Sequence, residues 1–344
     1  MMNTSHRHMQ DIFELPDRLG QGLVRLVVVL IATLPLAVGA TDEADFDWAN
    51  PPGQRVSVGS HKLHILCKGH GRQTVVIDSG VGGFSLEWTR IQNALAKHYQ
   101  VCTYDRAGYG WSDPGPLPRT TKQIATELYT LLKNADIRGP YILVGHSFGG
   151  YNIRYFASKH PADVQGLVLV DSSHPDQDAR FPSRKTKKIG PPPRIVKVYD
   201  PYAPYTTRVW ISRPVMPDNY PHEVRLQAFA LMSTRKARIT QRLELESFKI
   251  SASQVASAGP LPNVPLMVLT RGKRVWPTNY YGDLMEKAWT ELQDELATLA
   301  PRSVHLVAEH SGHSIHLDEP GLVINAVSTI VDSTSIEYFA QNGP

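Results

Sequence analysis

The sequence has 344 residues, of which 42% are hydrophobic and 20% are charged. This composition excludes disordered, collagen-like and coiled-coil proteins and is typical of a globular protein with a full hydrophobic core. The formal net charge is only +4. Because phosphate binding needs a concentrated basic face, this charge does not favour a nucleic-acid partner. Residues 174–260 hold 15 Lys and Arg against 7 Asp and Glu, which predicts either a solvated basic face or attraction to an anionic substrate or membrane surface.

An apolar run without charge, LVVVLIATLPLAVGA, occupies residues 26–40. A transmembrane helix needs about 20 apolar residues, whereas a shorter run that ends in small residues is typical of a signal peptide. We predict that residues 1–40 are a cleaved signal peptide or a retained N-terminal anchor, with a buried core helix as the alternative. The protein is then exported, periplasmic or secreted, and the anchor would associate it with the inner membrane. Residues 41–52 are predicted to be a polar linker.

Short β-branched runs alternate with helical patterns along the chain, which predicts βαβ units and a largely parallel sheet. The predicted strands are residues 54–58, 62–67, 74–77, 100–104, 141–144, 166–170, 264–270 and 303–307. The predicted helices are residues 86–97, 121–135, 148–159, 279–299 and 320–331. In the last of these, Val323, Val327, Ile330 and Val331 repeat on one face, as expected for a helix packed on a sheet.

The alternation stops between the sixth and seventh predicted strands. Residues 191–221 are rich in proline, which breaks regular elements, and a helical stretch follows at 222–248. We therefore predict that residues 174–260 form a cap inserted between two parts of a core, residues 53–173 and 261–335. The cap is expected over the carboxyl edge of the sheet, where open α/β sheets bind their ligands.

The motif VGHSFGG follows an apolar strand and precedes a helical pattern at residues 144–150. Gly145, Ser147 and Gly149 form a GxSxG pattern, which holds a nucleophilic serine on a tight turn between strand and helix. The backbone N–H of Phe148 would then point toward a developing oxyanion near the start of the helix. This context predicts Ser147 as a nucleophile.

A serine nucleophile needs a base from a loop at the same edge. His313 in the turn HSGHSIHLDEP, after the last predicted strand, is the preferred candidate, with His310 and His316 as alternatives. His146 is expected to point into the fold.

The loop DSGVGGF at residues 78–84 follows the third predicted strand and is expected to supply the second oxyanion donor. The N–H of Val81 is preferred, and Gly80 and Gly82 remain alternatives.

Two cysteines are present, Cys67 and Cys102, each in a short β-like run. If the two strands are neighbours they can form a disulfide, which suits an exported protein; the alternative is two buried thiols. Two cysteines cannot make a closed zinc site, and no HExxH spacing occurs. We expect no metal and no cofactor.

Five segments together resemble the α/β-hydrolase superfamily: VVIDSGVGGFSLEW, VCTYDRAGYGWSDPGPLPRT, YILVGHSFGG, GLVLVDSSHPDQ and SGHSIHLDEP. They are similar to exported bacterial members that are esterase-like, lipase-like or prolyl aminopeptidase-like. The resemblance implies an α/β fold with an eight-stranded, mostly parallel sheet flanked by helices, and a helical cap between strands six and seven. It also implies that the second strand lies beside the fourth, which would place Cys67 near Cys102.

The resemblance implies catalytic roles for Ser147 and His313, with Val81 and Phe148 in the oxyanion hole, but the triad acid departs from the family pattern. The usual position after the seventh strand reads TRGKRVWP and contains no carboxylate. Asp171, at the end of the sixth strand, is the preferred acid because the order serine, aspartate, histidine is then kept. Asp283 is the alternative.

These features predict a serine hydrolase that cleaves a small-molecule carboxylic ester through an acyl-enzyme and a Ser-His-Asp triad. The alternatives are a prolyl aminopeptidase-like peptidase or amidase and, from a different class, a non-catalytic ligand-binding protein of the same fold. The candidate substrate-binding residues are Trp210, Phe229, Met232 and Trp276.

Overall fold

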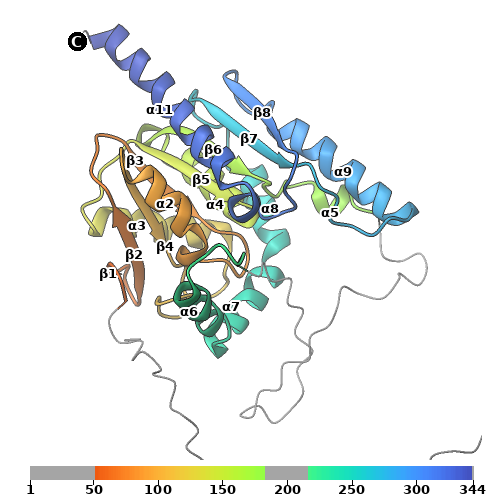
Figure 1. Ribbon diagram of the computed structural model, residues 1–344, viewed down its shortest axis with the longest axis horizontal. Helices are drawn as coiled ribbons and strands as arrows, with labels where there is room; N and C mark the ends of the chain where they lie inside the picture. The colour runs from red at the N-terminus through yellow and green to blue at the C-terminus, as the bar shows by residue number, and fades with distance from the viewer. Residues whose placement is uncertain (1–50, 183–215, 343–344) are drawn as a thin grey trace, which may run out of the picture. The chain divides into compact units, whose positions relative to one another are not determined.

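A computed structural model describes residues 51–182 and 216–342 of the chain. Eight strands form one sheet in the order β1-β2-β4-β3-β5-β6-β7-β8 (Figure 1). The pairs β1–β2 and β2–β4 are antiparallel. The remaining strands, from β4 through β3 to β8 in the sheet order, all pair in parallel. The strands are β1 Gln54–Ser57, β2 Lys62–Lys68, β3 Thr74–Asp78, β4 Gln100–Tyr104, β5 Tyr141–His146, β6 Val164–Val170, β7 Leu266–Arg271 and β8 Ser303–Ala308.

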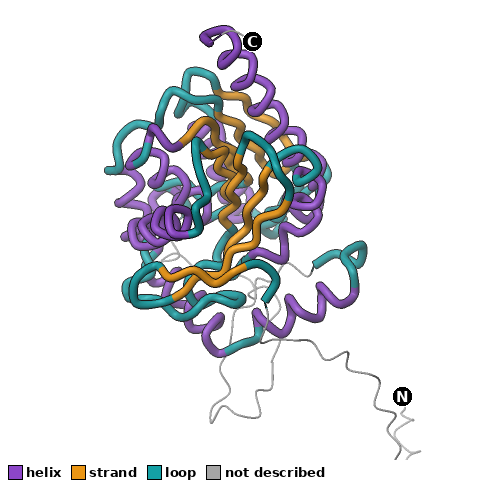
Figure 2. Tube along the Cα trace, turned by 90° about the vertical axis from the view of Figure 1, so that its left-hand side faces the viewer, coloured by secondary structure: helices purple, strands orange, loops and turns teal. Residues whose placement is uncertain are grey.

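Helices cover both faces of this sheet (Figure 2). Those that follow the strands of the core are η1 Ser85–Trp88, α2 Thr89–Leu95, α3 Thr121–Asn134, α4 Phe148–Lys159, η2 Pro161–Asp163, α5 Gln177–Arg180, α9 Tyr280–Leu296, α10 Ile315–Asp318 and α11 Pro320–Asn342. Between β6 and β7 lie α6 His222–Met232, α7 Arg235–Glu246 and α8 Phe248–Ala256. The eight-stranded, mostly parallel sheet flanked by helices and the helical insertion are as predicted.

The central strands are apolar at successive positions because both of their faces are buried. Val75 and Ile142 belong to the cluster that packs against α2 and α11, whereas Val76 and Leu143 belong to the cluster that packs against α3 and α4. The predicted apolar face of the last helix is also buried, with Val327 fully enclosed. The alternation of side chains along each strand thus divides the core into two layers.

The predicted helical stretch at residues 222–248 is helical in the structure, where it is divided into α6, α7 and the start of α8. The breaks fall at hydroxyl residues that compete with the helical hydrogen bonds. The side chain of Thr234 accepts a hydrogen bond from Ala237 N and starts α7, while Ser247 lies between α7 and α8. The insertion therefore folds back on itself over the loops that follow β3 and β4, where α6 and α7 share a buried cluster with Phe84 and Tyr109.

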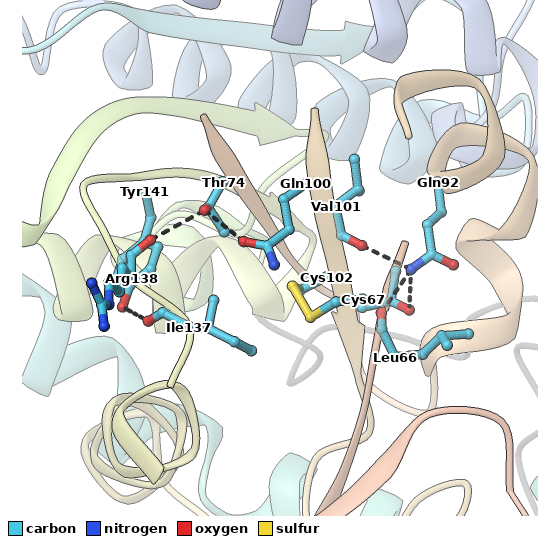
Figure 3. Close-up of a disulfide and its surroundings, with 11 residues drawn as sticks. Leu66, Cys67, Thr74, Gln92, Gln100, Val101, Cys102, Ile137, Arg138 and Tyr141 are labelled. Carbon is cyan, nitrogen blue, oxygen red and sulfur yellow. Dashed lines mark hydrogen bonds between the residues drawn. A yellow bond between two sulfur atoms is a disulfide. The ribbon is translucent and has the colours of Figure 1, made fainter. Parts of the chain in front are cut away.

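Cys67 and Cys102 form a disulfide between adjacent strands (Figure 3). The two residues are directly opposite in the antiparallel pair of β2 and β4, with their Cα atoms 4.0 Å apart. The buried amide of Gln92 in α2 donates hydrogen bonds to Leu66 O and Val101 O, the carbonyls that precede the two cysteines. This pairing follows from the neighbouring strands that the family resemblance implied.

The predicted leader and residues 41–50 of the predicted linker lie outside the described residues, as does the proline-rich stretch from 191 to 214. Among the helices of residues 51–182 and 216–342, none is both long and apolar enough to cross a membrane.

Candidate active site

Ser147 lies on a sharp turn between β5 and α4. Its backbone has φ 51° and ψ −118°, a conformation that L residues rarely adopt and that costs on the order of 1–3 kcal/mol. The turn is held by hydrogen bonds from Ser147 N to Val170 O and from Ser173 N to Ser147 O, both 3.1 Å. The side chain is partly exposed, in contrast to the buried residues around it. The strand, turn and helix thus present a hydroxyl at the carboxyl edge of the sheet.

Small residues allow the loop after β3 to approach this turn. A Cβ atom on Gly149 would lie 2.3 Å from Asp78 O, and one on Gly80 would lie 3.1 Å from the Cβ of Ser147. The loop that was predicted to carry an oxyanion donor therefore crosses directly beside the serine. Phe148 is the first residue of α4 and is fully buried.

The three candidate donors of this loop differ in their environment. Gly82 N already donates to the hydroxyl of Tyr109 at 3.2 Å. Gly80 O accepts from Gly83 N and from Arg106, while the side chain of Val81 packs against the cluster that contains Phe148. With Gly82 engaged elsewhere, the geometry favours the N–H of Val81 or Gly80.

His313 and Asp171 are brought together from the loops after β8 and β6. His313 Nδ1 lies 2.5 Å from Asp171 Oδ2, so the other ring nitrogen, Nε2, is left for a proton transfer. His313 O lies 2.9 Å from the Nε2 of His146, the neighbour of the serine, and the two imidazole rings are 4.7 Å apart. These contacts place the His313 loop against the turn that carries Ser147.

The carboxylate of Asp171 is fully buried and is held on several sides. Oδ1 accepts from Trp289 Nε1 at 2.9 Å and from Arg271 N at 3.2 Å, and Oδ2 also accepts from the Arg271 guanidinium at 3.1 Å. Burial alone would raise the pKa of Asp171, but the hydrogen bond from His313 and the nearby charges of His313 and Arg271 outweigh it and lower the pKa. The carboxylate therefore remains ionised and can fix the tautomer of His313.

The alternative base candidates have other surroundings. His310 is exposed, and its backbone N donates to Glu319. His316 is fully buried, stacks on Trp88 with ring centroids 4.5 Å apart, and lies 3.7 Å from a carboxylate oxygen of Glu87.

The alternative acid is also placed elsewhere. Asp283 is exposed and pairs with Arg274, with 2.6 Å between the charged atoms. Among the candidates named from the sequence, Asp171 and His313 are the pair that the structure joins.

His146 points into the fold, as expected. Burial and the nearby charges of His316 and His313 lower the pKa of His146 well below its usual value, so the ring is neutral at working pH. The protonated nitrogen of this neutral ring must then be Nε2, which donates to His313 O. His146 therefore helps to hold the loop of the candidate base.

The four candidate substrate-binding residues differ in position. Trp210 lies outside the described residues. Trp276 stacks on the guanidinium of Arg271 and lies 6.0 Å from the ring of Trp289, which places it next to the groups that hold Asp171. Phe229 on α6 is 56% exposed, and Met232 at the end of the same helix packs against the buried cluster formed with Tyr109.

Possible metal ligands gather at a different place, outside this triad. His174, Asp176 and Glu295 have ligand atoms within 4.8 Å of one another. However, His174 Nδ1 already accepts from Asp176 N, and Glu295 is bound by the exposed Arg180. These hydrogen bonds account for the arrangement, and we assign no metal to it.

Arg271 and Trp289, which bind the Asp171 carboxylate, were not among the predicted site residues. Arg271 is 2% exposed at its side chain and lies between the rings of Trp276 and Trp289, 4.5 and 4.7 Å from their centroids. A signal was present, because Arg271 occupies the end of β7, close to the usual position of the triad acid.

The fold and the geometry agree with a match between residues 70–326 and the profile of the "Alpha/beta hydrolase family". The match covers most of the chain, and the protein belongs to this family.

Individual relatives add detail. The chain is 28% identical over 260 residues to the YqjL protein of Bacillus subtilis (strain 168), covering 76% of this chain and 84% of that protein. It is 28% identical over 296 residues to "Probable transporter efuK" of Hormonema carpetanum, but these are 80% of this chain and only 42% of that protein. One similar solved structure is that of the CarC enzyme, a serine hydrolase involved in carbazole degradation. Its TM-score is 0.57 at 16% sequence identity, and the match covers 81% of this chain and 98% of the CarC chain. At that identity the likeness concerns the fold alone.

Proposed function

We propose that the protein is a serine hydrolase that cleaves a small-molecule carboxylic ester through an acyl-enzyme, with Ser147, His313 and Asp171 as its triad. The observation that carries the proposal is the 2.5 Å contact between His313 Nδ1 and the buried Asp171 carboxylate, beside the strained turn of Ser147. The family to which the chain belongs is consistent with hydrolysis. The basic residues near 174–260 suit an ester with an anionic group.

The reaction would proceed in two halves. Ser147 Oγ attacks the acyl carbonyl while Nε2 of His313 takes its proton, and Asp171 stabilises the imidazolium that forms. The N–H groups of Val81 and Phe148 would bind the oxyanion of the tetrahedral intermediate. His313 then gives its proton to the departing alcohol. A water molecule repeats the sequence on the acyl-enzyme and releases the acid.

The test is hydrolysis of p-nitrophenyl esters from acetate to palmitate by the purified protein, Ser147→Ala and Ser158→Ala. Ser158 is a matched control because it lies on α4, the helix that follows Ser147, and its hydroxyl donates to Gly259 O, away from the turn. We expect hydrolysis by the wild type and the control, and a loss on the order of 10⁶ in kcat for Ser147→Ala. If the wild type hydrolyses none of these esters, the ester proposal is wrong. The hypotheses to test are then hydrolysis of amides and ligand binding without turnover.

We also propose that residues 1–40 direct export and that residues 174–260 act as a cap. The disulfide between Cys67 and Cys102 supports export because such bonds persist in oxidising compartments. Mass spectrometry of the mature N-terminus after expression in a bacterium, together with fractionation, tests the first proposal. An intact leader on protein found in the cytoplasm would contradict it.

A further inference from the structure

A buried network of charged groups joins the insertion between β6 and β7 to the loop beside Ser147. Its centre is Arg106, which follows β4 and is 2% exposed. Arg106 Nε and Nη2 donate to the two carboxylate oxygens of Glu244 on α7, at 2.8 and 3.0 Å. Nη1 of the same guanidinium donates to Asp78 Oδ1 at 2.8 Å. Glu244 is fully enclosed although α7 is otherwise a polar helix.

The same guanidinium holds the backbone of the loop that follows β3. Arg106 Nη1 donates to Ser79 O, and Nη2 donates to Gly80 O at 2.7 Å. A second path runs through Tyr109, whose hydroxyl donates to Glu244 Oε2 at 2.9 Å and accepts from Gly82 N at 3.2 Å. Glu244 thus reaches both sides of Val81, through Gly80 by one path and through Gly82 by the other.

Close packing supports the same connection. Thr240 lies on α7, one turn before Glu244, and contacts Gly108 closely. A Cβ atom on Gly108 would be 1.8 Å from the hydroxyl oxygen of Thr240. Gln241 lies against Gly82 in the same way, 2.9 Å from the position of a Cβ. One face of α7 is therefore docked on the loops after β3 and β4 with no space for water between them at these points.

We propose that Glu244 is a positioning residue for the loop after β3, residues 78–84. Docking of α7 would then set the position of the N–H group that binds the oxyanion. This inference rests on the proposed function. The carboxylate does not touch the reacting atoms; it acts through Arg106 and Tyr109. Buried ion pairs of this kind give a fixed geometry rather than a large gain in stability, because desolvation offsets much of their attraction.

A displaced donor affects the transition state more than the bound ester, because the oxyanion forms only during the reaction. Glu244→Gln is therefore expected to lower kcat on the order of 10²-fold with little change in KM. Glu246→Gln, an exposed residue on the same helix that pairs with Arg242, is the matched control and should retain wild-type kcat. Tyr109→Phe removes only a hydroxyl and should also lower kcat, by a smaller factor.

The experiment measures kcat and KM of these variants on the best p-nitrophenyl ester, with the number of active sites counted by the burst of p-nitrophenol. Inhibition by a boronic acid with the same acyl chain is measured in parallel, since its tetrahedral adduct needs the same donors. The proposal predicts that kcat per counted site falls and that the boronic acid binds more weakly. An unchanged kcat per site in Glu244→Gln, with fewer sites, would show a purely structural role and overturn it.

Failure of the Glu244→Gln variant to fold and failure of the proposed function can each be distinguished from failure of this proposal. If Glu244→Gln does not fold, Tyr109→Phe decides the question by the same two readouts, and a wild-type kcat per site in this variant would overturn the proposal. If the wild type itself shows neither turnover nor a burst, the proposed function has failed rather than the positioning role of Glu244.

Discussion

The Asp171 carboxylate accepts hydrogen bonds from three residues, His313, Arg271 and Trp289, and each of them comes from a different element. Asp171 itself has a positive φ of 39°, so the chain is strained at both the candidate nucleophile and the candidate acid. Strain at two neighbouring positions persists only where the surrounding structure holds it. In this site the buried guanidinium of Arg271 is part of what holds it.

Replacing Asp171 by asparagine should lower kcat for ester hydrolysis on the order of 10⁴-fold, because the amide favours the wrong tautomer of His313. Steady-state kinetics measures the loss. The unfolding transition is recorded as well, since Arg271 loses one of its two carboxylate partners and keeps Glu286. Asp283→Asn serves as the control and should behave as wild type; a loss in that variant with none in Asp171→Asn would reverse the assignment of the acid.

Local patterns were sufficient to predict the serine turn and the histidine loop, whereas the family resemblance was needed to place Cys67 near Cys102. The partners of Asp171 and Arg106 were not predictable in the same way. Arg271 lies 100 residues from Asp171, and Glu244 lies 138 residues from Arg106. A charged residue in a polar helix such as α7 is normally solvated. Only the packing of that helix against the loops after β3 and β4 makes Glu244 a buried partner.

At the scale of elements, the contact between α4 and the loop after β3 depends on the absence of a side chain at Gly149. In Gly149→Ala the new methyl group would meet Asp78 O at 2.3 Å and Ser79 O at 2.7 Å, which are backbone atoms that cannot rotate away. We expect a loss of about 1–3 kcal/mol in the free energy of unfolding and a lower kcat. Urea denaturation and ester kinetics measure the two effects.

Gly321→Ala on α11 is the matched control for that substitution, because no atom lies within 4 Å of the new Cβ. It should leave kcat unchanged and stabilise the helix slightly. Equal behaviour of the two alanine variants would mean that the loop after β3 is free to move away from α4.

The disulfide joins β2 to β4 and encloses a loop with a sequence separation of 35 residues. In the chain-entropy account, closing a loop of this length stabilises the folded state by about 4 kcal/mol. The double variant Cys67→Ser, Cys102→Ser should therefore unfold at a lower urea concentration than the wild type by an amount that corresponds to this energy. Reduction of the wild type with dithiothreitol should give the same shift, and an unchanged midpoint in both experiments would contradict the prediction.

At the scale of the whole molecule, several buried ionisable groups make stability depend on pH. Burial lowers the pKa of His146, His160 and His174. Each of these histidines takes up its proton more readily in the unfolded chain, so they reduce stability as the pH falls below about 6.5. For His64, burial opposes protonation but Asp105 outweighs it and raises the pKa; its contribution is complete below about 6.5 and is lost as the pH rises through the folded value.

We therefore expect the free energy of unfolding to fall from pH 7 to pH 5, by up to about 1.4 kcal/mol per pH unit for the buried His146. Urea denaturation at pH 7, 6 and 5 measures this slope. The variant His146→Gln retains a donor for His313 O and should show a shallower slope. A wild-type midpoint that is the same at pH 7 and pH 5 would contradict the expectation.

The eight strands and their mostly parallel pairing were predictable, because buried parallel strands are apolar at nearly every position. Their order in the sheet was not, apart from the second strand beside the fourth, which the family resemblance implied. The division of the insertion into three helices did not follow from the sequence, since hydroxyl residues such as Thr234 and Ser247 are tolerated within helices and become caps only when the chain turns there. Long-range packing decides between these two outcomes.

Covalent labelling tests whether Ser147 is the nucleophile. The protein is treated with a fluorophosphonate, digested and analysed by mass spectrometry, and residual hydrolysis of the best p-nitrophenyl ester is measured on the same sample. We expect one adduct per chain, on the peptide that contains Ser147, with loss of hydrolysis in proportion to labelling and no adduct in Ser147→Ala. Full hydrolysis by a protein labelled at Ser147, or an active enzyme that is labelled at another residue, would contradict this expectation.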